Sequence, residues 1–109
     1  MIKEADIERA VDYLRNSAQE AAEARAQVKY LAEFLKAKVA KIATAQAGMS
    51  AAAAEQIAKA HPDYSDLLDG YRVAVEKDAF HTFKREAAAA MIDAWRTQCS
   101  NARVEGRIG

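Results

Sequence analysis

The chain has 109 residues, which is enough for one domain. Its 16 basic and 16 acidic residues cancel, and a pI near 6.7 argues against the strongly basic character of a dedicated nucleic-acid-binding protein, although a local basic patch remains compatible with it. Alanine accounts for 27 of the hydrophobic residues, and there are only four Gly and one Pro, so we expect an all-α chain with a thin core.

An apolar residue recurs every 3.5 positions along the first forty residues. The seam runs through Ile7, Val11, Leu14, Ala18, Ala21, Arg25, Val28, Ala32, Leu35, Val39 and Ile42. This heptad spacing lets one helix lie along another and supercoil with it. No Gly or Pro interrupts it, so the sequence predicts one helix over about 5–47, ended by Gly48. Arg25, the one charged seam residue, is expected to fix register or oligomeric state at some cost in stability.

A connector over about 48–62 separates this helix from a second long one. Ser50 is a suitable N-cap for a short Ala-rich helix within the connector. Pro62 suits the first turn of the second long helix, which we expect over about 63–104, with a frayed tail at 105–109. The apolar side of the second helix is predicted to contain Tyr64, Leu68, Tyr71, Val75, Ala79, Phe83, Ala87, Ala90 and Ala94.

Charge predicts that the two long helices form an antiparallel, coiled-coil-like hairpin. The first helix begins acidic and ends basic, and so does the second, so folding back pairs opposite charges at both ends. Asp63 would then lie near the lysines around Lys38, and Arg96 near Glu4, Asp6, Glu8 and Asp12. The larger apolar residues occupy more faces than one hairpin can cover, so a single domain over 1–109 assembled as a homo-oligomer is expected. The predicted packing residues are Arg25, Val28, Leu31, Leu35, Val39, Phe80, Phe83 and Trp95.

No motif in the sequence is typical of an enzyme or a metal site. The only histidines, His61 and His81, have no Cys or carboxylate at metal-site spacing, and no glycine-rich phosphate loop is present. We therefore expect no catalytic activity, cofactor or metal. The single cysteine, Cys99, favours a reducing compartment. With neither a signal peptide nor a transmembrane run in the sequence, we expect a cytoplasmic protein.

The second half of the first helix carries a local charge of +4, because five basic residues are opposed there only by Glu33. In one interpretation these cations complement the helix dipole and the acidic start of the second helix. In the other they track phosphates, while the interleaved aromatic rings stack on bases. The candidate DNA-binding residues are Lys29, Tyr30, Phe34, Lys36, Lys38, Lys41 and Lys59.

Three segments resemble a family of small tailed-phage proteins: YLAEFLKAKVAKI at 30–42, AHPDYSDLLDGYRVAVE at 60–76 and IDAWRTQCSNARVEGR at 92–107. The shared features are an AHPxY junction and a terminal WRTxxxNxR, and they span nearly the whole chain. More loosely, the first segment is similar to the UvsY-type recombination mediators of T-even phages. That resemblance implies a ring-like homo-oligomer that binds single-stranded DNA and assists a recombinase against a single-strand-binding protein. The connector departs from that family, since Lys59 is its only basic residue.

Two functions therefore remain open from the sequence. The first is a phage accessory protein of homologous recombination that binds single-stranded DNA as a homo-oligomer, with a recombinase or single-strand-binding protein as partner and no membrane association. The second is a helical protein–protein interaction module without nucleic-acid binding, such as an anti-defence inhibitor, an assembly chaperone or an adaptor.

Overall fold

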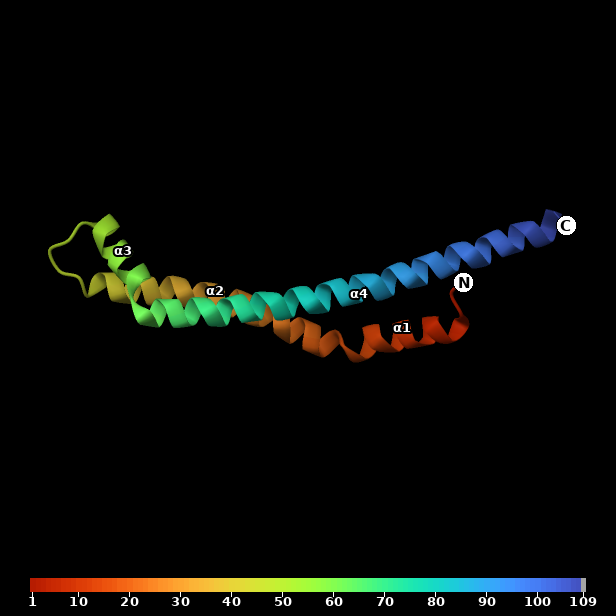
Figure 1. Ribbon diagram of the computed structural model, residues 1–109, viewed down its shortest axis with the longest axis horizontal. Helices are drawn as coiled ribbons and strands as arrows, with labels where there is room; N and C mark the ends of the chain where they lie inside the picture. The colour runs from red at the N-terminus through yellow and green to blue at the C-terminus, as the bar shows by residue number, and fades with distance from the viewer. Residues whose placement is uncertain (109) are drawn as a thin grey trace. The chain divides into compact units, whose positions relative to one another are not determined.

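The computed structural model describes residues 1–108 and is all-α, as the sequence predicts (Figure 1). Its helices are α1 (Glu4–Asn16), α2 (Ala18–Thr44), α3 (Ala51–Ala60) and α4 (Pro62–Ile108). Over this range there is no β-strand. None of the helices in residues 1–108 has both the length and the apolar character needed to cross a bilayer.

The helix expected over 5–47 is divided into two at Ser17. The Ser17 N–H still donates to the Tyr13 carbonyl at 2.9 Å. From α4, however, the Arg85 guanidinium donates to the Leu14 carbonyl and to Ser17 Oγ, both at 2.8 Å. A side chain inserted into a helix's own hydrogen-bond ladder is a recognised cause of an interruption. The break therefore comes from a tertiary contact, although no Gly or Pro marks it in the sequence.

Local signals position the ends of the shorter elements. Gly48 adopts φ +79°, the left-handed conformation that follows a helix. Ser50 caps α3 as predicted, with its hydroxyl accepting from the Ala53 N–H at 3.2 Å. His61 Nδ1 accepts from the Asp63 N–H at 3.0 Å, which satisfies a free donor in the first turn of α4.

The chain forms two compact units. Unit 1 comprises 1–21 and 80–109, and unit 2 comprises 22–79. In unit 2, ion pairs join Arg25 to Asp78 at 3.5 Å and Lys38 to Asp63 at 3.4 Å, so α2 and the start of α4 run antiparallel. In unit 1, α1 lies along the C-terminal part of α4 (Figure 1).

The charge pairing expected in unit 1 differs from what the structure contains. Asp6 forms its ion pair with Arg9, one turn along α1, and Arg96 pairs with Asp93 on α4 at 3.7 Å. Both pairs are therefore local to one helix. Neighbours three residues apart on a helix are always within reach, whereas a cross-helix pair depends on register.

The core is thin in both units. The buried apolar residues are Ile7, Ala10, Ala24, Ala54, Ala58 and Ala74, five of them alanines. The accessible surface is 8040 Å² for a chain of 11.9 kDa. A compact monomer of that mass is expected to expose about 5900 Å². The chain thus leaves far more surface in contact with solvent than its mass requires.

The apolar side predicted for α4 is displaced in the structure. The positions turned inward follow heptad steps through Tyr64, Leu67, Tyr71, Ala74, Asp78, His81, Arg85, Ala88, Ile92 and Trp95. Leu68, Val75 and Phe83, which the sequence pattern placed inside, are exposed. The difference arises because polar residues occupy three consecutive seam positions. Asp78 pairs with Arg25 and Arg85 with the Leu14 carbonyl, so a pattern built on apolar residues alone misses this register.

Candidate nucleic-acid interface

An exposed aromatic pair lies on α2. The Tyr30 and Phe34 ring centroids are 5.9 Å apart at an interplanar angle of 32°. They are 60% and 41% exposed, although both are large apolar side chains. Residues four apart share one face of a helix, so the rings form a continuous surface on which a planar group can stack.

Lysines border this pair. Lys41 lies seven residues after Phe34, on the same side of α2, and Lys29 and Lys36 form an adjacent row seven residues apart. Within the described residues, neither Lys29 nor Lys41 forms an ion pair. Lys36 pairs with Glu33 at 3.3 Å, and both side chains are exposed. Such a surface pair contributes little, so the Lys36 ammonium is available to an anion.

The remaining two candidate lysines have carboxylate partners in the structure. Lys38 is half-buried and its ammonium pairs with Asp63 at the start of α4. Lys59 on α3 is exposed and pairs with Glu55 at 3.0 Å, and this hydrogen bond raises the pKa of Lys59 above its usual 10.5. Lys38 therefore stabilises the pairing of α2 with α4, while Lys59 remains a fully charged surface cation.

Folding places Lys59 next to the α2 lysines, because Lys59 and Lys36 line the same shallow groove in unit 2. Residues from α2, α3 and the start of α4 line it: Leu35, Lys36, Val39, Glu55, Lys59 and Tyr64. Tyr64 is a candidate that sequence reasoning placed only in the apolar side of α4. The aromatic residue after an AHP junction is the sequence signal, but its proximity to Lys36 depends on the packing of three helices.

The predicted packing residues divide into two groups. Val28, Leu31, Leu35, Val39 and Trp95 are half-buried. Arg25 lies at the surface, and Phe80 and Phe83 are also exposed, although the Phe80 ring lies beside Lys84 and His81 of the same helix.

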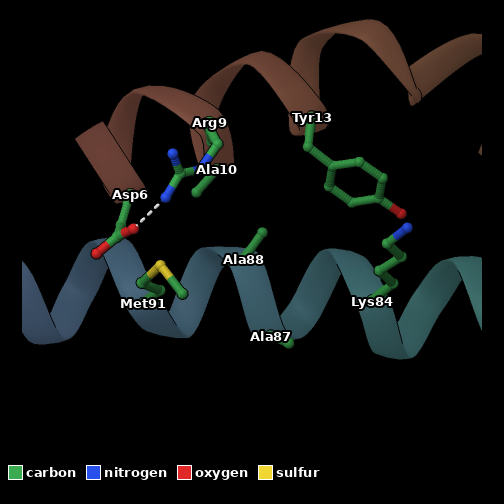
Figure 2. A pocket seen from close by; sticks show the side chains of 8 residues that line it. All are labelled: Asp6, Arg9, Ala10, Tyr13, Lys84, Ala87, Ala88 and Met91. Carbon is green, nitrogen blue, oxygen red and sulfur yellow. Dashed lines mark hydrogen bonds and ion pairs between the residues drawn. The ribbon is translucent and has the colours of Figure 1, made fainter. Parts of the chain in front are cut away.

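A second groove, in unit 1, is lined by Asp6, Arg9, Ala10, Tyr13, Lys84, Ala87, Ala88 and Met91 (Figure 2). The Lys84 ammonium lies 4.8 Å from the centroid of the Tyr13 ring and 5.5 Å from that of Phe80. These are cation–π distances.

At the other end of this groove, the Lys3 backbone N–H and the Arg9 guanidinium hold the pKa of Asp6 below its usual value. The groove therefore contains one cation already satisfied by two rings and one carboxylate already paired. The Tyr13 hydroxyl, from another lining residue, is buried without a hydrogen-bond partner.

Among residues 1–108, no cluster of three or more His, Cys, Asp or Glu side chains is placed to hold a metal ion. No protein-family model, curated protein or solved structure matches this chain.

Proposed function

We propose that this protein binds single-stranded DNA as a homo-oligomer, through the face of α2 formed by Lys29, Tyr30, Phe34, Lys36 and Lys41. The observation that carries the proposal is the exposed Tyr30–Phe34 pair bordered by accessible ammonium groups. Aromatic rings stack on unpaired bases, and lysines neutralise phosphates. A single strand offers both groups at once, whereas a duplex keeps its bases stacked inside.

Oligomerisation accounts for how a neutral chain can bind a polyanion. One copy supplies only a few phosphate contacts, and its 16 acidic residues oppose long-range attraction. Repeating the face on linked copies converts later contacts into intramolecular ones and raises the overall affinity. Within unit 2 of each copy, the antiparallel pairing of α2 with the start of α4, to which the ion pair of Lys38 with Asp63 contributes, holds the α2 face in place.

The resemblance to phage recombination mediators adds a biological role to this proposal. In that role the protein assists a recombinase in displacing a single-strand-binding protein from DNA. Stacking and counterion release are both independent of base sequence, as such a role requires.

Fluorescence anisotropy of a labelled oligonucleotide, titrated across a salt series, tests the proposal. We expect binding at low salt that weakens steeply toward physiological salt and is weaker for duplex DNA. Tyr30→Ala with Phe34→Ala should reduce the affinity. Met49→Ala, which removes an exposed apolar side chain elsewhere in unit 2, serves as the control. No anisotropy change at low salt from the intact assembly would contradict the proposal.

A second candidate function, the protein–protein interaction module, is favoured by the exposure of Phe80 and Phe83 on α4. Two phenylalanines on an uncovered helix face are typical anchors for a partner helix. An assembly that fails to bind DNA but depends on these rings to capture another protein would support this second candidate.

A further inference from the structure

In unit 1, α4 carries a second heptad seam on its outer side. Residues such as Arg85 and Ala88 point toward α1, whereas the exposed Ala87 borders the groove of unit 1 (Figure 2). The outer seam, in alternating steps of three and four, consists of Phe80, Phe83, Ala87, Ala90 and Ala94. All five are exposed, Phe80 by 60% and Phe83 by 67%. Within the described residues of unit 1, the ring contacts at this seam come from α4 itself, where Lys84 and His81 lie beside the Phe80 ring.

An apolar seam with this spacing fits another helix, because knobs repeating every 3.5 residues insert between the side chains of a facing helix. The seam is also divided by size. Its first part carries two phenylalanines, and its remainder carries only alanines. A flat or globular partner would not fit both the part with large side chains and the part with small ones. A helix that carries the same two parts in reverse order would fit both.

A second copy of this chain provides that reversed order. Around a two-fold axis near Ala87, an antiparallel α4 places Phe80 and Phe83 opposite Ala94 and Ala90 of the second copy. Large then meets small on both sides of the axis, where Ala87 faces Ala87, and the interface is self-complementary, as two-fold symmetry requires. A parallel pair would bring phenylalanine against phenylalanine and hold the alanine parts too far apart to pack.

The exposed area is consistent with a second copy. The chain exposes 8040 Å². This exceeds the ~5900 Å² expected for a compact monomer of its mass by about 2100 Å². Stable interfaces bury about 1,200–2,000 Å² in total, or about 600–1,000 Å² on each partner, so the excess of one chain is more than such an interface needs.

We infer that α4 forms a two-fold antiparallel dimer through this outer seam, with its axis near Ala87. The inference rests on the homo-oligomer in the proposed function and names the surface that builds it. It uses none of the residues assigned to the nucleic-acid interface.

Disulfide trapping of single-cysteine variants tests both the surface and the direction. In a Cys99→Ser background, Ala87→Cys places the two thiols opposite each other at the axis, and it should oxidise to a covalent dimer. Ala94→Cys should not, because fourteen residues of helix, ~21 Å at 1.5 Å per residue, separate its two copies. Disulfides need Cα atoms within about 7 Å. Trapping of both variants indicates a parallel pair, and trapping of neither indicates another surface; either result overturns the inference.

Light scattering of Phe83→Asp supplies an independent measurement. We expect its mass to fall from the oligomer to the 11.9 kDa chain with unchanged helical circular dichroism. Ile57→Asp, a matched change at an exposed apolar residue on α3, should leave the mass unchanged. A monomeric wild-type chain would contradict both the oligomer and this seam. If the wild-type chain is an oligomer but disulfide trapping fails, only the seam is contradicted. The nucleic-acid interface is tested separately by DNA anisotropy.

Discussion

Two exposed aromatic pairs, one in each unit, differ in what surrounds them. Tyr30 and Phe34 on α2 lie among lysines, whereas Phe80 and Phe83 on α4 are followed by alanines along one helix face. The rings themselves are equally able to pack. Their neighbours decide the partner, because ammonium groups favour a polyanion with planar bases and small side chains allow another helix to approach closely.

The largest expected effect comes from removing the positive charge that the α2 surface carries beside its aromatic pair. Replacing Lys29, Lys36 and Lys41 with Ala should abolish measurable binding of single-stranded DNA at physiological salt. At low salt, the slope of log affinity against log salt should become shallower by about 2, since each lost phosphate contact contributes roughly 0.7.

The control for the lysine variant is Lys77→Ala, an exposed position on α4, which should change neither quantity. Because Ala is a good helix former, both variants should retain their helical content. An unaltered slope in the triple variant would remove α2 from the nucleic-acid interface.

Truncating each aromatic pair in turn, and measuring both DNA binding and assembly mass, tests whether the two pairs have different partners. Tyr30→Ala with Phe34→Ala should weaken DNA binding about tenfold or more, since stacking contributes about 1–3 kcal/mol per base, and leave the assembly mass unchanged. Phe80→Ala with Phe83→Ala should lower the mass measured by light scattering. Equal effects of the two double variants on both measurements would mean that the two aromatic pairs belong to one surface.

Within unit 1, Arg85 should contribute more to stability than any surface ion pair. Arg85→Met keeps the aliphatic packing but leaves the Leu14 carbonyl and Ser17 Oγ without their charged donor, so the free energy of unfolding should fall by about 1–3 kcal/mol. Urea denaturation measures this loss. Arg85→Lys, which restores one donor, should recover part of it; a variant as stable as the parent would show that the break at Ser17 does not need Arg85.

Substitution of Arg25 tests whether this residue makes a stabilising polar contact in unit 2 or is a charged residue that only weakens an apolar seam. From the sequence alone, Arg25→Leu should stabilise the chain and blur its oligomeric state. Since Arg25 pairs with the half-buried Asp78, we now expect the single change to lower stability by up to about 1 kcal/mol. Arg25→Leu combined with Asp78→Leu should restore it, and a double-mutant cycle on thermal unfolding gives the coupling.

The smallest effect concerns pH and Asp6. Because its pKa is lowered in the folded chain, the stabilisation from Asp6 is present above the ordinary carboxyl pKa of 3.8 and is lost as pH falls through the lowered value. Asp6→Asn should therefore be slightly less stable than the parent near neutral pH and equal to it under strongly acidic conditions. Chemical denaturation at several pH values measures the difference, and a constant difference across the range would contradict the assignment.

The sequence by itself determined the features whose causes lie within a few residues. Heptad spacing and the scarcity of Gly and Pro gave an all-α chain, and Gly48 and Ser50 marked the connector where they lie in the structure. The Tyr30–Phe34 pair could also be read directly, since residues four apart share a helix face whatever the fold. Each of these depends only on backbone geometry and neighbouring side chains.

Only the tertiary structure decided the break at Ser17, the register of α4 and the place of Tyr64 beside Lys36. A charged residue such as Arg85 or Asp78 reads as a solvent-facing position until its partner across the helix pair is known. Because polar atoms turned inward are mostly those that a partner receives, apolar periodicity cannot locate such positions. Contacts between residues far apart in the chain therefore chose which face of α4 turned inward, and with it which phenylalanines were left outside.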